Sequence, residues 1–226
     1  MQLAVAAALA AAAGLLLGSL LQAFARRLVR GMPGTSAWSR PGGARLPTRL
    51  PLVELASAAL FAATVVVHHD DVPMLVLGIL LVAFLVPLTL VDLAVRLLPN
   101  RLTAPAAGMA VVVGTLLDPS GEPERLLAGG AAGGCFLLAA LASPAGMGMG
   151  DVKLAAVLGL FLGREVAVAV FVALVAGVAV GVLIMARKGA REGRKTAVAF
   201  GPFLALGGVV AVIAGDGLMD AYLARV

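Results

Sequence analysis

Long apolar runs separated by short polar or glycine- and proline-rich breaks follow one another along the whole chain. A transmembrane helix needs about 20 predominantly apolar residues, and several runs reach or approach that length. They cover residues 3–24, 51–68, 73–91, 103–117, 126–142, 152–163, 165–186 and 198–215. The pattern predicts an all-α fold, a polytopic membrane helical bundle with about eight transmembrane helices, in which residues 1–226 form a single membrane domain.

The composition excludes an ordinary soluble domain. Hydrophobic residues make up 62% of the 226 residues, charged residues make up 13%, and the mean hydropathy is +1.07. Soluble domains are about 45–50% apolar and about 25% charged, so lipid must solvate part of this chain. The first run, residues 3–24, is long enough to span and has no basic residue before it. We therefore expect a retained first helix rather than a signal peptide.

Most of the 17 lysines and arginines lie in alternate loops, those after the first, third, fifth and seventh runs. Only Arg125, Arg164 and Arg225 fall on the other side. The positive-inside rule then predicts that the basic loops are cytoplasmic and that both termini lie outside the cytoplasm. If the sixth and seventh runs formed one helix, the basic segment 187–195 would lie outside, which favours two helices. The net charge of +5 does not indicate nucleic-acid binding, because the charges sit in these short loops.

The longest polar stretch, residues 25–50, is rich in glycine, proline and arginine and shows no helical period. We expect a short cytoplasmic loop lying beside anionic lipid headgroups. A docking surface for a substrate or partner is the alternative.

The cysteine and histidine content gives no support for a metal site. Cys135 is the one cysteine of the chain, so neither an internal disulfide nor a CxxC metal site can form. Because it lies in an apolar run, we expect it to be a buried packing residue. His68 and His69 stand beside two aspartates between apolar runs, and we expect both to be solvated loop residues on the outer face.

Three acidic residues lie where apolar runs begin or end. An ionised group inside a span costs about 2.5–3.5 kcal/mol even on lenient scales, so each needs a reason. Asp92 is near the end of the third run, Asp151 opens the sixth, and Glu54 opens the second. The predicted topology puts Asp92 and Asp151 at the same depth on the same side of the membrane. After Asp92, Pro99-Asn100 is expected to end the third helix, and Thr103 is expected to be the N-cap of the fourth helix.

Two carboxylates that converge in this way cannot both ionise freely, so one keeps its proton while the other acts as a base. A water between them can then be activated toward a peptide carbonyl, as in aspartic proteases. Glycines 146, 148 and 150 would let a substrate backbone approach and adopt positive φ. Lys153 would tune the pair electrostatically or extend to the headgroups. The residues alone leave two alternatives open: a proton- or cation-coupled small transporter using the two acids, and a non-catalytic assembly scaffold.

Two motifs resemble the type IV prepilin peptidases, or leader peptidases, of the GxGD aspartic-protease class. "DLAVRLLPNRLT", which begins at Asp92, is similar to the family's Asp, six residues, Pro-Asn/Asp-x-Leu-Thr pattern. "GMGDVKL", which contains Asp151, is similar to Gly-x-Gly-Asp-x-Lys-Leu/Met. The segments "LGSL", "RLPLVE" and "FGPFL" also resemble family segments, so the likeness extends over almost the whole chain.

The resemblance implies that Asp92 and Asp151 are the catalytic pair of an aspartic endopeptidase. It implies prepilin or pseudopilin substrates, cut after a glycine just before their hydrophobic segment, at the cytoplasmic face of the bacterial inner membrane. No cofactor is expected, and the oligomeric state is left open. Glu54 would either cap its helix or act near the substrate. The residues expected to support the site are Gly148, Gly150, Lys153, Pro99 and Asn100.

One departure from the family pattern concerns residues 25–50. Many members carry paired CxxC motifs that bind zinc in this loop, and here the loop is short and has no cysteine. Many of the longer members also methylate the new N-terminal residue with S-adenosylmethionine. With the loop reduced, we do not expect that second activity.

Overall fold

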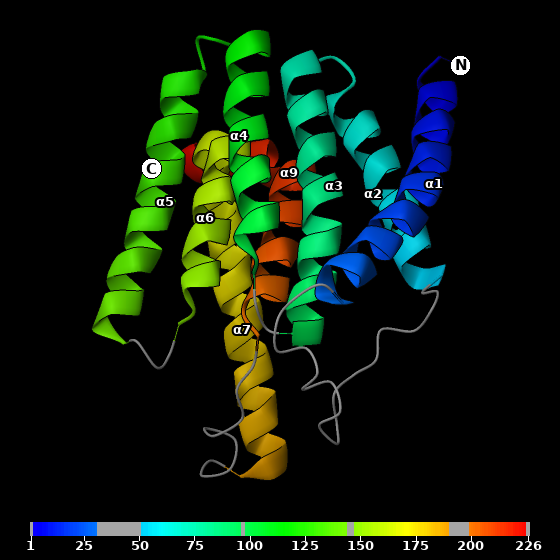
Figure 1. The fold of residues 1–226 in the computed structure, drawn as a ribbon. Coiled ribbons are helices and arrows are strands. Elements are labelled where there is room, and N and C mark those ends of the chain that lie inside the picture. The colour runs from blue at the N-terminus through cyan, green and yellow to red at the C-terminus, as the bar shows by residue number, and fades with distance from the viewer. Residues whose placement is uncertain (1, 31–50, 96–97, 144–146, 190–198, 225–226) are drawn as a thin grey trace.

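A computed structural model describes residues 2–30, 51–95, 98–143, 147–189 and 199–224 (Figure 1). Within these ranges every regular element is a helix, which confirms the predicted all-α class. The α-helices are α1 (Gln2–Arg30), α2 (Pro51–His68), α3 (Val72–Val95), α4 (Asn100–Leu117), α5 (Glu122–Ala142), α6 (Met149–Leu162), α7 (Val166–Lys188) and α9 (Gly201–Leu223).

Small residues bring neighbouring helices into backbone contact. On α1, Gly14 and Gly18 have the GxxxG spacing that lets membrane helices approach closely. A Cβ at Gly14 would lie 2.7 Å from the Cα of Ala58, and one at Gly18 would lie 3.0 Å from the Cα of Glu54. The later residue of α1, Gly18, contacts the earlier residue of α2, Glu54, so the two helices run antiparallel.

The centre of the bundle is formed by α3, α6 and α9, which meet around Gly208 of α9. A Cβ there would lie 2.7 Å from Leu158 of α6 and 3.2 Å from Leu85 of α3. Large apolar side chains also cover the outside of the bundle; Leu127 and Phe171, for example, are 74% and 68% exposed. Apolar residues on both the inside and the outside fit a protein whose solvent is lipid.

The chain reverses between α6 and α7, in a single 3₁₀ turn at Gly163–Glu165. Gly163 has a φ of +58°, a left-handed conformation that glycine adopts without strain. The α6 end of the turn lies near Glu124, at the start of α5, and Glu165 packs against Gly215 near the end of α9. The sixth and seventh apolar runs therefore form two antiparallel helices, as the basic loops predicted.

Six segments of the described chain are long and apolar enough to cross a membrane. They are Gln2–Val29, Pro51–His68, Val72–Val95, Glu122–Ala142, Met149–Arg187 and Gly201–Tyr222. Met149–Arg187 contains the reversal at Gly163, and α4 is not among the six. The described chain is thus a multi-span helical bundle, while eight crossings with both termini outside the cytoplasm stay a prediction.

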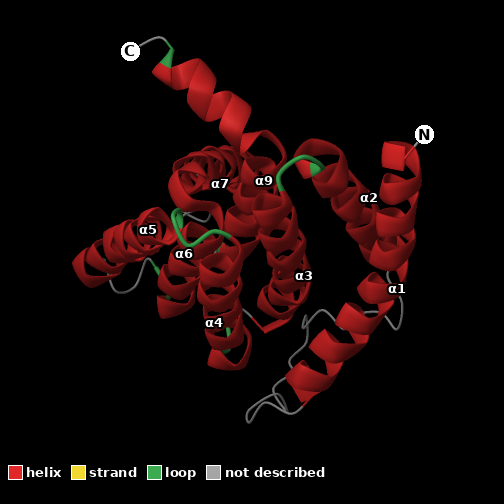
Figure 2. Cartoon of the chain, turned by 90° about the horizontal axis from the view of Figure 1, so that it is seen from above, coloured by secondary structure: helices red, strands yellow, loops and turns green. Residues whose placement is uncertain are grey.

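Successive helices alternate in direction, so α2, α4, α6 and α9 begin at the end of the bundle where α1, α3, α5 and α7 finish (Figure 1). We call this the site end, because Asp92 and Asp151 both lie there. Viewed along the helices, α1 and α2 form one side of the bundle and α5 the other (Figure 2).

A buried ion cluster fixes the turn between α4 and α5 at the opposite end. Arg125 is 8% exposed and donates to Asp118 at 2.8 Å and to Glu122 at 3.1 Å. The hydrogen bond from Arg125, with others from Ser120 and the Gly121 amide, lowers the pKa of Asp118 to about 2.

Replacing Arg125 should therefore destabilise the fold. We expect Arg125→Ala to lower the free energy of unfolding by about 3–5 kcal/mol, because the buried Glu122 carboxylate loses its cation. Unfolding in detergent micelles measures the change. The control is Asp70→Ala, which removes an exposed side-chain contact with His69 and should change stability by less than about 1 kcal/mol. Equal effects of the two substitutions would contradict the structural role of Arg125.

Candidate active site

Asp92 lies in the last turns of α3 and is 5% exposed. Its carboxylate abuts the first residue of α9: a Cβ at Gly201 would overlap Oδ2 and would lie 3.0 Å from Cγ. Backbone N–H groups at a helix N-terminus favour a nearby negative charge. The start of α9 therefore offers both the space and the electrostatic environment that a buried carboxylate needs.

Asp151 lies in the first turn of α6 and is half-buried. Its amide donates to the carbonyl of Gly148 at 3.1 Å, which shapes the start of the helix. The carboxylates of Asp151 and Asp92 are close enough to interact electrostatically. Two acids 59 positions apart in sequence thus come from different helices to one place, one of them buried and the other partly open.

The described glycines before Asp151 do not have the backbone conformation that was expected of them. Gly148 has an extended backbone with a φ of −79°, and the only positive-φ glycines in the described ranges are Gly163 and Gly189. The expected positive φ at Gly148 and Gly150 is therefore wrong, and Gly146 lies outside the described residues. Close packing is the reason for glycine at 150, where a Cβ would lie 2.9 Å from the Cβ of Leu98. Gly148 is exposed, and a Cβ there would lie 3.6 Å from the Asp151 carboxylate.

A side-chain hydrogen bond joins the two sequence motifs. Lys153 Nζ on α6 donates to Asn100 Oδ1 at the start of α4, at 2.7 Å. The Lys153 ammonium thus has a partner within the site instead of only headgroups. With the Leu98–Gly150 contact, this bond fixes the start of α6 against the connection between α3 and α4.

The fourth helix begins earlier than the sequence suggested. Pro99 is its N-cap, and the amides of Leu102 and Thr103 donate to the Pro99 carbonyl at 2.9 and 3.3 Å. Thr103 is buried inside the helix, so its predicted capping role is wrong. Proline suits this boundary because it has no backbone N–H and its ring clashes with a preceding helical turn, so a helix cannot continue through it from the preceding residues.

Glu54 lies in the first turn of α2, also at the site end, and is half-buried. Its Cα packs against Gly18 of α1. The position suits an acid that complements the helix dipole, and a role near the substrate stays a prediction.

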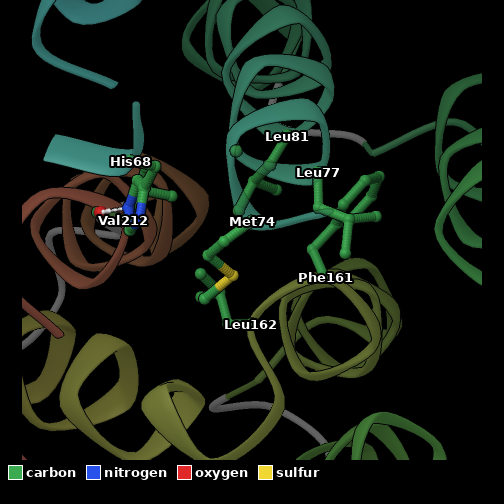
Figure 3. Close-up of a pocket in the computed structure, with 8 residues that line it drawn as sticks. His68, Met74, Leu77, Leu81, Phe161, Leu162 and Val212 are labelled. Carbon is green, nitrogen blue, oxygen red and sulfur yellow. Dashed lines mark hydrogen bonds between the residues drawn. The ribbon is translucent and has the colours of Figure 1, made fainter. Parts of the chain in front are cut away.

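His68 differs from its predicted place. It is 6% exposed at the end of α2, far from the site end, and its Nε2 donates to the carbonyl of Val212 at 2.6 Å (Figure 3). His68 lines a small recess together with Met74, Leu77 and Phe161, and this recess has no room for a water molecule. The expectation of a solvated His68 is therefore wrong, whereas His69 is exposed as predicted.

Cys135 is also misplaced by the sequence pattern, because its side chain is exposed on α5 rather than buried. In the described part of the chain, no three His, Cys, Asp or Glu side chains gather into a group suited to hold a metal ion.

Gly201 is the residue that the motifs did not assign to the site. The signal was the glycine of "FGPFL", just before a proline at the start of the last apolar run. Nothing in the sequence says that this helix begins beside Asp92.

Comparison with known proteins bears on the same residues. The model of the type IV leader peptidase family matches residues 79–183. A prepilin leader peptidase/N-methyltransferase of Xanthomonas campestris pv. campestris is 32% identical over 193 residues, which cover 82% of this chain and 66% of that protein. The protein of the same name from Neisseria gonorrhoeae is 30% identical over 185 residues, covering 78% and 62%.

The corresponding Bacillus subtilis protein is 28% identical over 183 residues, covering 80% of this chain and 72% of that protein. The chain thus spans about two thirds of the length of the relatives it matches. No solved structure matches it. The matched segment includes both Asp92 and Asp151, and the chain belongs to the type IV leader peptidase family.

Proposed function

We propose that this protein is a membrane aspartic endopeptidase that removes the leader peptide of type IV prepilins or pseudopilins. It cuts after a glycine, just before the substrate's hydrophobic segment. One observation carries the proposal: Asp92 and Asp151 come from separate helices to the same end of the bundle. The names of the relatives, prepilin leader peptidase/N-methyltransferase, support the choice of substrate.

The proposed chemistry divides two roles between the carboxyl groups. Since neighbouring like charges oppose each other, the pair holds one proton between them. The ionised member takes a proton from a bound water as that water attacks the scissile carbonyl. The protonated member donates a hydrogen bond to the carbonyl oxygen. The proton taken from the water then passes to the leaving amine. No metal or cofactor takes part in this scheme.

The neighbouring residues act as positioning residues. Gly150 lets Leu98 pack against the start of α6, and the Lys153–Asn100 bond holds α6 to α4 beside the Pro99 cap. Exposed Gly148 leaves the flank of Asp151 open to a substrate backbone.

The site end would face the cytoplasm, because the basic loops follow α1, α3, α5 and α7. A multi-pass protein of the bacterial inner membrane is the corresponding location. We further propose that the chain does not methylate its product, since residues 25–50 lack the cysteine motifs. Intact-mass measurement of the cleaved pilin checks this, because methylation would add the mass of one methyl group.

The first prediction concerns the two carboxyl groups. Asp92→Asn and Asp151→Asn should each lower prepilin cleavage by about 10²–10⁴-fold or more, because an amide can neither accept nor supply the catalytic proton. The assay uses liposomes and the prepilins of the three organisms named above. Wild-type protein that cleaves none of them, or full cleavage by either variant, would contradict the proposal. Flux of an ion without any cleavage would instead favour the transporter, and unchanged pilus assembly by both variants would favour the scaffold.

The second prediction concerns the space beside Asp92. Gly201→Ala should lower the cleavage rate by about 10²-fold, because the new methyl group displaces the carboxylate. Gly217→Ala is the matched control on the same helix, since nothing lies within 4 Å of a Cβ there. If both variants cleave at the wild-type rate, Gly201 does not position Asp92.

The third prediction concerns the Lys153–Asn100 bond. Lys153→Met and Asn100→Ala should each slow cleavage about fivefold, and the double variant should be no slower, since a hydrogen bond of this kind contributes about 1 kcal/mol. Arg101→Met removes an exposed charge next to Asn100 and serves as control. Additive losses in the double variant would show that the two residues act independently.

A further inference from the structure

A groove of about 580 Å³ runs along the bundle between α2, α3 and α9. In the view along the helices, α2 stands beside α3 and α9 (Figure 2). Among the described residues that line the groove, Thr89 alone carries a polar side chain. The groove is therefore a recess for an apolar group within the membrane.

One end of the groove reaches the candidate active site. Its lining includes Leu90, two residues before Asp92, and Pro202, which follows the glycine that abuts the Asp92 carboxylate. At its other end lie Val82 of α3 and Val209 of α9. At a rise of 1.5 Å per residue, the distance from Val82 to Leu90 is about 12 Å, or about two helical turns. An occupant would thus extend from the carboxylate into the hydrocarbon, parallel to the helices.

The wall formed by α2 suits a helix rather than a bulky side chain. Ala56 and Ala59 are exposed and face the groove. Small residues let the backbones of two membrane helices approach closely, and such packing drives their association where lipid gives no hydrophobic force.

We propose that this groove receives the hydrophobic segment of the substrate as an additional transmembrane helix. The inference rests on the proposed function: a bond cut just before an apolar segment leaves that segment to enter the membrane directly beside the two aspartates. The groove is the apolar path that begins there. The groove, which is about two helical turns long, would hold the residues that follow the scissile bond. The scissile bond would then lie at the depth of Asp92.

Cross-linking tests the position of the substrate helix directly. The enzyme carries Asp151→Asn to keep the substrate intact, Cys135→Ser to remove the native thiol, and Ala59→Cys in the groove. The substrate is the best-cleaved of the three prepilins, with one cysteine within eight residues after the cleavage site. With a copper–phenanthroline oxidant added to accept the two electrons, we expect a disulfide to form with Ala59→Cys. The matched control keeps native Cys135, which is exposed on α5 outside the groove, and should form none.

Filling the groove gives a second, kinetic test. Ala59→Phe should lower kcat/KM for the full-length prepilin at least tenfold, whereas Ala131→Phe on the exposed surface of α5 should leave it unchanged. Circular dichroism and thermal unfolding confirm that both variants fold. Equal cleavage by the two phenylalanine variants, or cross-linking that does not favour Ala59→Cys, would overturn the groove proposal.

The two proposals fail in different ways. If either Asp→Asn variant still cleaves, the aspartic mechanism is wrong. If both are inactive but Ala59→Phe cleaves like the control, only the groove assignment is wrong. Loss of a bound lipid from Ala59→Phe in native mass spectra, with cleavage unchanged, would make an acyl chain the occupant.

Discussion

A carboxylate buried at the end of a membrane helix is kept only where a neighbour leaves room for it and stabilises its charge. Here that neighbour is the first turn of α9, and the glycine at position 201 makes the approach possible. The position of the start of α9 is therefore determined by Asp92 at the end of α3. Because α9 also packs on α6 and α7, this one contact ties the candidate site to the central packing of the bundle.

The site is built from chain segments that are distant in sequence. The start of α6 packs against Leu98 and hydrogen-bonds to Asn100, while the end of α3 abuts the start of α9. Each contact joins a helix terminus, where unsatisfied backbone groups and a change of direction occur together. In a bundle of alternating helices, such termini collect at two ends, so one end can hold polar chemistry while the middle stays apolar.

The sequence predicted the helices well because lipid requires long continuous apolar runs, and these runs can be read without knowledge of packing. It also predicted that Asp92 and Asp151 share one end, from the alternation of the loops. It did not predict which surfaces face inward, since an apolar side chain on a membrane helix carries the same signal toward lipid and toward protein. Cys135 was misplaced for this reason. His68 was misplaced because its neighbouring aspartates suggested a solvated loop, whereas its bond to the Val212 carbonyl depends on a helix distant in sequence. The role of Gly201 depends on a contact across 109 positions, which no local pattern encodes.

The shortness of α6 has an electrical consequence. Its 14 residues extend about 21 Å, against about 30 Å for the hydrocarbon core of a bilayer. An acid lies at each end of it, Asp151 in the first turn and Glu165 just beyond the last. The two carboxyl-bearing residues at its ends are therefore separated by less than the thickness of a hydrocarbon core. A charge at one end of α6 acts on the other end more strongly than it would across a full hydrocarbon core, because the Coulomb interaction falls with distance.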